Sequence, residues 1–296
     1  MTAKLQGIIA AVPTPFTADS KNVDLDNIPK QVERLISAGI HGIVTTGTTG
    51  EFPALTVEEH KAVIKAFIDA AKGRVPVIAG FGCNSTQAAI DMAQYSEKVG
   101  ATACMIVPPF YDPLSFKALV KFYKDVCSSI SVPVMYYNLP GATGIHLTAD
   151  QIRELGEIKG LDYLKDTSGN AKELADLLVN PSSNITPFNG ADTLTYSAIS
   201  QGAQGNVFAV GALVPKECVD FWNSLVVEKN HEKAREQWKF LWELSDFLEA
   251  VNYPAGVKAG LDIMGCSAGP ARPPTLPLEP EEIKKLEQIL SKRTYK

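Results

Sequence analysis

The chain has few cysteines, and their arrangement gives them no evident structural use. Only 5 of the 296 residues are cysteine. They are scattered and never form a Cys-x-x-Cys pair: Cys83, Cys104, Cys127, Cys218 and Cys266. This pattern indicates neither a disulfide framework nor a zinc site, and the 4 histidines also lack metal-ligand spacing. We therefore expect no metal site, and free thiols in a reducing compartment.

Positive charge is scarce as well. The net charge is −5 and no run of Lys or Arg is present, so a nucleic-acid-binding surface is not indicated. No apolar run approaches the length of a membrane span, and residues 1–7 lack the features of a targeting signal. We expect a cytoplasmic protein that binds neither nucleic acid nor membrane.

Short apolar runs alternate with amphipathic segments along most of the chain. We expect eight strands, at residues 7–13, 42–46, 75–81, 101–108, 132–138, 160–166, 185–189 and 205–210. Helical patterns separate or follow them, at residues 26–38, 57–71, 86–99, 116–130, 149–155, 171–179, 193–201 and 215–227. Thr56 and Thr148, each followed three residues later by Glu or Gln, are typical helix-start signals.

Eight such units with nearly continuous apolar strands predict an α/β protein with a TIM (β/α)8 barrel rather than an open, doubly wound sheet. After about residue 228 the strand signals stop, and residues 230–251, 254–264 and 279–290 have helical patterns. We therefore predict a barrel catalytic domain over residues 1–228 and a C-terminal helical extension over residues 229–296.

Lys165 lies at the C-terminal end of the sixth predicted strand, where catalytic residues gather in such barrels. Burial disfavours the charged form of an amine, and a neutral amine can attack a ketone to form a Schiff base. The alternative is a structural lysine that pairs with Asp162 or Asp166. This segment alone does not decide between the two interpretations.

Two other strand ends carry polar groups. After the second strand, Gly47 and Gly50 flank Thr48 and Thr49, so that backbone N–H groups and hydroxyls together suit a small carboxylate. The alternative is a turn with threonine caps. At the end of the fifth strand, Tyr137 could relay a proton beside an amine, or simply pack.

The loops after the third and fourth strands are less specific. Tyr111 follows the fourth strand in a proline-rich loop, and could equally be a surface or interface aromatic. The segment at residues 80–85 resembles a dinucleotide fingerprint but lacks its third glycine. We interpret Asn84 and Ser85 as helix caps and expect no nicotinamide site.

Taken together, residues 47–51, 137–140 and 165–169 resemble the dihydrodipicolinate synthase / N-acetylneuraminate lyase superfamily of class I, pyruvate-dependent aldolases. The resemblance covers nearly the whole chain. It implies that Lys165 forms the Schiff base and that Tyr137 relays protons. It also implies pyruvate or a 2-keto acid and an aldehyde as substrates, no metal or organic cofactor, and a homo-oligomer, either a dimer or a homotetramer.

The same resemblance assigns the remaining site residues. Thr48 and Thr49, with the backbone of Gly47, would bind the keto-acid carboxylate. Thr48 would also link Tyr137 to Tyr111, which in dihydrodipicolinate synthases reaches the neighbouring subunit's site. The backbone carbonyl of Val207 would approach the lysine.

Departures from the family pattern narrow the expected substrate. Ala142 stands where dihydrodipicolinate synthases have an Arg that holds the aldehyde's carboxylate, and Ala88 and Phe110 replace the Glu and Tyr of feedback-inhibited members. Residues 51–53 are more similar to hydroxy-oxoglutarate and keto-deoxy sugar-acid aldolases. We therefore predict an aldolase that cleaves or forms a 4-hydroxy-2-oxo acid or a 2-keto-3-deoxy sugar acid. The alternatives are dihydrodipicolinate (4-hydroxy-tetrahydrodipicolinate) synthase, a keto-deoxy sugar-acid dehydratase and a non-catalytic keto-acid sensor.

Overall fold

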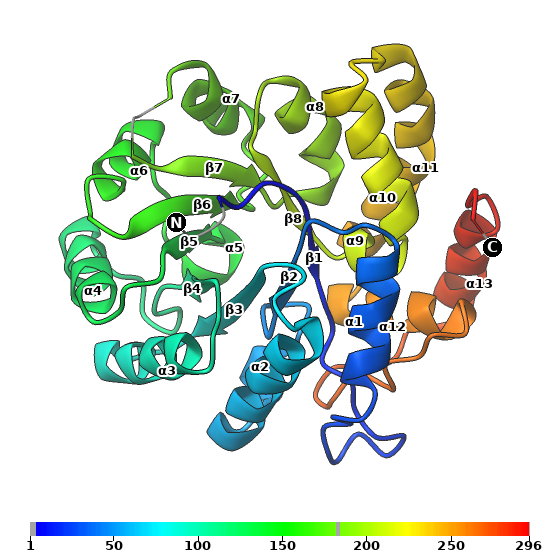
Figure 1. Cartoon of the computed structure of the whole chain (residues 1–296), viewed down its shortest axis with the longest axis horizontal. Coiled ribbons are helices and arrows are strands. Elements are labelled where there is room, and N and C mark those ends of the chain that lie inside the picture. Colours follow the sequence, from blue (N-terminus) through cyan, green and yellow to red (C-terminus); the bar gives the residue numbers. More distant parts are fainter. Residues whose placement is uncertain (1–3, 182–183, 296) are drawn as a thin grey trace.

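Eight parallel strands close into a barrel in the computed structural model, which describes residues 4–181 and 184–295 (Figure 1). Each strand pairs with the next, and β1 pairs with β8 from Gly7↔Gly205 to Ala10↔Phe208. The strands are β1 Gly7–Ala11, β2 Gly42–Thr45, β3 Val77–Gly82, β4 Ala103–Val107, β5 Val134–Asn138, β6 Leu161–Asp166, β7 Thr186–Asn189 and β8 Gly205–Phe208. The predicted TIM barrel is confirmed.

Helices surround the barrel, as Figure 1 shows. The longer ones on the barrel are α1 Ile28–Ser37, α2 Val57–Ala71, α3 Thr86–Lys98, α4 Phe116–Ser128, α6 Ala149–Leu155, α7 Ala171–Val179, α8 Thr195–Ser200 and α10 Pro215–Trp222. The C-terminal extension consists of α11 His231–Ala250, α12 Tyr253–Ile263 and α13 Pro280–Leu290. Thr56 and Thr148 form the expected capping boxes at the starts of α2 and α6.

The sequence missed several short helical turns. These are η1 Phe52–Ala54, α5 Pro140–Thr143 and α9 Val210–Leu213. The predicted helices at 193–201 and 215–227 do include most of η2 Asp192–Leu194 and all of the π-turn η3 Asn223–Val227, which continues α10. Segments of three to five residues are too short to show a helical period. The expected strand at 205–210 also ends early, because α9 begins at Val210.

Two strands begin later than predicted for a local reason. β3 and β5 begin just after Pro76 and Pro133, which have no N–H to donate to a neighbouring strand. Their carbonyls still accept, from Ile43 N at 2.9 Å and from Cys104 N at 3.0 Å. The hydrogen bonds to the neighbouring strands therefore begin at Pro76 and Pro133, one residue before β3 and β5 themselves.

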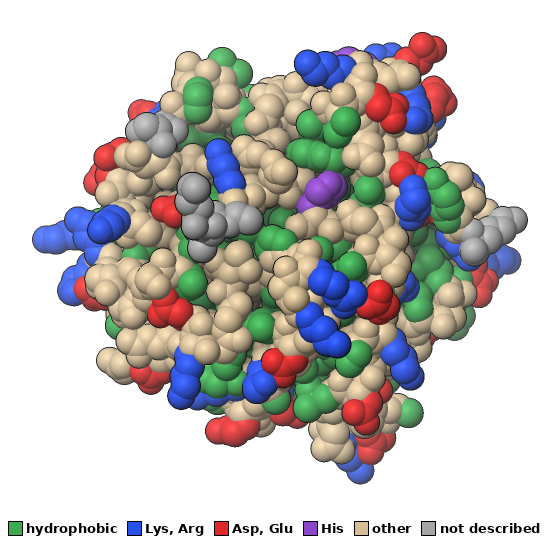
Figure 2. All heavy atoms as spheres, in the orientation of Figure 1, with side chains coloured by type: hydrophobic (Ala, Val, Ile, Leu, Met, Phe, Trp, Pro, Cys, Tyr) green, Lys and Arg blue, Asp and Glu red, His purple; other side chains and the backbone are tan. Residues whose placement is uncertain are grey.

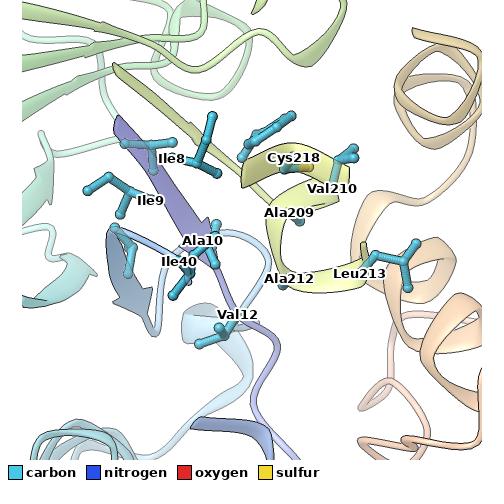
Figure 3. Close-up of a cluster of buried hydrophobic side chains, with 14 of the residues drawn as sticks. Ile8, Ile9, Ala10, Val12, Ile40, Ala209, Val210, Ala212, Leu213 and Cys218 are labelled. Carbon is cyan, nitrogen blue, oxygen red and sulfur yellow. The ribbon is translucent and has the colours of Figure 1, made fainter. Parts of the chain in front are cut away.

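The extension packs into the same core as the barrel. The two parts meet at α9, which belongs to the barrel. Figure 3 shows Ile8, Ile9 and Ala10 of β1 next to the buried side chains of α9. A Cβ on Gly260 of α12 would lie 2.8 Å from Leu213 Cδ1 of α9, so this glycine allows close contact between the two helices. Each buried leucine on such an interface stabilises the fold by about 1.5–3 kcal/mol.

On the surface, basic and acidic side chains are interspersed over the face that Figure 2 shows. No helix in residues 4–181 and 184–295 combines the length and apolar composition needed to cross a bilayer.

Candidate active site

A cavity of about 210 Å³ lies at the carboxyl ends of the strands. Five of the residues predicted from the sequence line it: Thr48, Thr49, Tyr137, Lys165 and Val207. They come from the ends of β5, β6 and β8 and from the loop after β2. The barrel thus brings together side chains that are up to 159 positions apart in the chain.

Lys165 is held against Tyr137. The two residues are register partners on β6 and β5, and Lys165 Nζ lies 4.1 Å from the centroid of the Tyr137 ring. Lys165 is only 5% exposed, and within the described chain it forms no salt bridge. Asp166 instead accepts hydrogen bonds from Asn138 Nδ2 at 2.8 Å and Ser168 N at 3.1 Å. The alternative of a structural ion pair with Asp162 or Asp166 is therefore wrong.

Gly190, at the end of β7, makes room for the lysine side chain. A Cβ at this position would lie 2.6 Å from Lys165 Cε and 2.3 Å from Thr167 Oγ1. Any side chain here would therefore displace the amine. Thr167 lines the same cavity, and its buried hydroxyl has no hydrogen-bond partner in the part of the chain that the structure describes.

Thr48 connects the loop after β2 with Tyr137. Its Oγ1 lies 3.4 Å from the Tyr137 hydroxyl, and either group can be the donor. Thr48 is exposed in the single chain, whereas Thr49 is buried. A proton could pass from Tyr137 through Thr48 towards the mouth of the cavity.

The backbone of this loop is unusual. Thr46 and Glu51 have φ values of 52° and 54°, in the left-handed region that non-glycine residues rarely adopt. A Cβ on Gly50 would lie 2.7 Å from Thr46 Cα. Thr14 Oγ1 donates to the Gly50 carbonyl at 2.6 Å, and Thr46 Oγ1 donates to the Gly80 carbonyl at 2.8 Å. Many contacts thus hold a strained loop in one shape.

The extension anchors the same loop through buried charges. Lys258 of α12 lies 2.7 Å from Glu51 Oε1, and both side chains are almost fully buried. Burial lowers the pKa of Lys258 to about 8. Arg272 N donates to Glu51 Oε2 at 2.8 Å. Both cations also lie close to the Phe16 ring, whose centroid is 4.1 Å from Lys258 Nζ and 4.2 Å from the Arg272 guanidinium.

Asp192 and Tyr253 also line the cavity, and sequence reasoning missed both. The Tyr253 hydroxyl donates to Asp192 Oδ2 and accepts from Ala209 N at 3.1 Å. Burial raises the pKa of Asp192 to about 7 and that of Tyr253 well above its usual value. The rule that strand ends carry the chemistry could have identified Asp192 after β7. Nothing in the sequence pattern brings Tyr253 from the extension to this point.

Tyr111 lies outside this cavity in the single chain. Its side chain is 88% exposed, and Asn84 Oδ1 holds its loop by accepting from Phe110 N at 3.2 Å and Tyr111 N at 3.4 Å. Ser85 is the N-cap of α3, as expected. The interpretation of Asn84 as a second cap was wrong, because its side chain reaches across to the loop after β4.

Comparison with known proteins places this geometry in a family context. The model of the dihydrodipicolinate synthetase family matches residues 4–293. A 4-hydroxy-tetrahydrodipicolinate synthase from Methanocaldococcus jannaschii is 36% identical over 286 residues, which are 96% of this chain and 97% of that protein.

Solved structures agree with this match. The chloride-inhibited dihydrodipicolinate synthase from Acinetobacter baumannii, complexed with pyruvate, superposes with a TM-score of 0.92 at 31% identity, over 97% of this chain and 98% of that one. The 4-hydroxy-tetrahydrodipicolinate synthase from Methylacidiphilum fumariolicum gives a TM-score of 0.92 at 30% identity, over 97% and 95% of the two chains.

Proposed function

Because this chain belongs to the dihydrodipicolinate synthetase family, whose members are carbon–carbon lyases that form a Schiff base with pyruvate, we propose that Lys165 is its nucleophile. The reaction we propose is cleavage or formation of a 4-hydroxy-2-oxo acid or a 2-keto-3-deoxy sugar acid. One observation carries this proposal: the buried amine of Lys165 lies over the Tyr137 ring and, among the described residues, forms no salt bridge.

In the cleavage direction, the Lys165 amine attacks the substrate's ketone, water leaves and an iminium forms. Tyr137 accepts the proton of the C4 hydroxyl at its phenolic oxygen while it passes its own hydroxyl proton to Thr48, and the same relay later returns a proton to C3. The electron pair of the C3–C4 bond moves towards the iminium nitrogen, and the aldehyde leaves. The resulting enamine takes a proton at C3, and water hydrolyses the iminium to release pyruvate and the free amine.

The loop after β2 would position the keto acid during these steps. We assign the hydroxyls of Thr48 and Thr49 and the N–H of Gly47 to the substrate carboxylate, because such donors together stabilise an anion. Thr48 also lies near the Tyr137 hydroxyl and can carry its proton. Val207, buried on β8 beside the cavity, would direct its carbonyl towards the lysine.

A second candidate is 4-hydroxy-tetrahydrodipicolinate synthase, the activity for which the Methanocaldococcus jannaschii relative is named. That reaction uses an aldehyde with its own carboxylate. Ala142 offers no cation at the position where the family's synthases have Arg, so we rank this candidate second. A keto-deoxy sugar-acid dehydratase would form the same imine but release water rather than an aldehyde. The alternative of a non-catalytic keto-acid sensor is wrong, because the chain belongs to a family of lyases.

We propose that the active unit is at least a dimer in the cytoplasm. The support for assembly is that Tyr111 is exposed in a proline-rich loop held by Asn84, as expected for a side chain that completes a neighbouring subunit's site. The support for the compartment is that all five cysteines are free thiols.

Borohydride reduction in the presence of pyruvate tests the nucleophile. It should add one pyruvyl unit to Lys165, because an imine there becomes a stable secondary amine. Lys165→Arg, which keeps the charge but removes the primary amine, should abolish the label and lower kcat at least 10³-fold. Peptide mass spectrometry locates the label, and its appearance on another lysine would contradict the assignment.

A further inference from the structure

A second cavity, of about 560 Å³, adjoins the one that holds Lys165. The two share Thr48 and Leu139 as wall residues. We call this second cavity the outer chamber, and the residues of its lining that matter here are Glu51, Phe52, Phe110, Ala142 and Asn252. A substrate chain that passed from Lys165 between Thr48 and Leu139 would therefore enter this chamber.

The walls of the outer chamber are mainly apolar. Phe52 and Phe110 meet edge to face there, with centroids 6.1 Å apart. Among the described residues of the lining, Glu51 has the only charged side chain, and its carboxylate already pairs with Lys258 and accepts a hydrogen bond from Arg272 N.

The polar groups of the chamber are few and partly engaged. The side-chain oxygen of Asn252 accepts from Ala255 N at 3.2 Å as the N-cap of α12. Ala142 contributes only a methyl group to the lining, where an Arg would have offered a cation. The chamber therefore has no cation for an acidic substrate.

We propose that the outer chamber binds an apolar substituent on the aldehyde side of the substrate. In the synthetic direction the acceptor is an aliphatic or aromatic aldehyde. In the cleavage direction the substrate is a 4-hydroxy-2-oxo acid with an apolar group beyond C4. This inference rests on the proposed Schiff-base function and narrows its substrate class.

The physical reason is the balance between apolar burial and unpaired charge. Each methylene moved from water into such a chamber improves binding by about fourfold, the equivalent of about 0.8 kcal/mol. A carboxylate in the same place loses its hydration without gaining a countercharge. The chamber therefore favours aldehydes with longer apolar chains over aldehydes that carry a carboxylate.

The test uses pyruvate with a homologous series of unbranched aldehydes, from acetaldehyde to pentanal, and measures kcat/KM for condensation. We expect kcat/KM to rise more than tenfold from acetaldehyde to butanal, which differ by two methylenes. Glyoxylate and aspartate semialdehyde should lie at least tenfold below butanal. A flat series, or a preference for the acidic aldehydes, overturns the proposal.

Variants at Ala142 localise the effect. Ala142 is exposed on the short α5, so a larger side chain can be placed there without disturbing the core. Ala142→Phe should remove the dependence on chain length by filling the chamber, and Ala142→Leu should reduce it. Ala142→Arg should raise kcat/KM for the semialdehyde at least tenfold. Ala171→Phe, at an exposed position on α7 outside both cavities, is the matched control and should keep the wild-type series.

Two further measurements separate the possible failures. Borohydride trapping of pyruvate on Lys165 is run on each variant. If trapping occurs but the series is flat, the inference is wrong and the Schiff-base function stands, whereas absence of trapping in the wild type overturns both. Light scattering reports assembly. If Ala142→Phe dissociates the oligomer instead of altering the series, a neighbouring copy occupies the chamber and the inference is wrong.

Discussion

Asp192 is a carboxyl group that the fold buries at the wall of the lysine cavity. Its pKa rises to about 7 because burial disfavours the carboxylate, although the Tyr253 hydroxyl and the positive charge of Lys165 act in the opposite direction. The folded protein therefore holds this proton more tightly than the unfolded chain does. The stabilisation is complete below about pH 3.8 and is lost as the pH rises through about 7.

Asp192→Asn should reveal this linkage. The amide oxygen can still accept from Tyr253 but has no charge to desolvate. We expect the unfolding free energy of the wild type, relative to the variant, to fall by about 2–3 kcal/mol between pH 5 and pH 8. Urea denaturation at several pH values measures it, with Asp246→Asn on the exposed face of α11 as the control. Parallel pH profiles for wild type and Asp192→Asn would show that Asp192 does not titrate in this way.

At the scale of the elements, helix α12 holds the loop after β2 through a buried ion pair. The loop carries Thr48 and Thr49 in a strained conformation, and Glu51 at its end is held by Lys258 of α12. Removing one partner of a buried ion pair strongly destabilises the folded protein, because the other charge stays buried without a countercharge. We infer that α12 positions the loop for substrate binding.

A double-mutant cycle on this pair tests the coupling. Lys258→Met should lower the unfolding free energy by about 3–5 kcal/mol, and adding Glu51→Gln should restore much of the loss. Both variants should raise KM for pyruvate more than they lower kcat, because Lys165 and Tyr137 stay in place. Chemical denaturation and steady-state kinetics give both readouts. Strictly additive losses of stability would mean that the two side chains do not interact energetically.

At the scale of the whole molecule, the division of the chain at residue 228 remains a proposal about its organisation. The extension contributes Tyr253 to the lysine cavity, Lys258 to the loop after β2 and buried leucines to the core around β1. We therefore interpret the extension as a part of the catalytic unit rather than as an appendage.

Subunit complementation tests whether the working site combines two copies. Tyr111→Phe and Lys165→Ala should each be nearly inactive alone. If Tyr111 acts in the neighbouring site, mixed oligomers should recover up to about a quarter of wild-type activity, because some sites then combine an intact Lys165 with an intact Tyr111. Activity after refolding an equimolar mixture measures this, and each variant refolded alone is the control. Hybrids that form but stay inactive would mean that Tyr111 does not act across subunits.

Much of this protein follows from its sequence because the signals are local. Alternation of apolar runs with amphipathic helices predicted the barrel, and the position of Lys165 at a strand end predicted a residue of the cavity. Tyr137 likewise lies at the end of β5, and Thr48 and Thr49 follow β2. In a closed parallel barrel all such ends meet at one rim, so chain order alone brings them together.

Other features were decided only by tertiary structure. Asp192 and Lys258 acquire shifted pKa values because the fold removes their water, and Tyr253 meets Asp192 because α12 packs against the barrel. The need for glycine at position 190 appears only when Lys165 lies beside it. The outer chamber is likewise formed by loops and the extension together. These properties depend on contacts between distant segments, and no local pattern in the sequence encodes them.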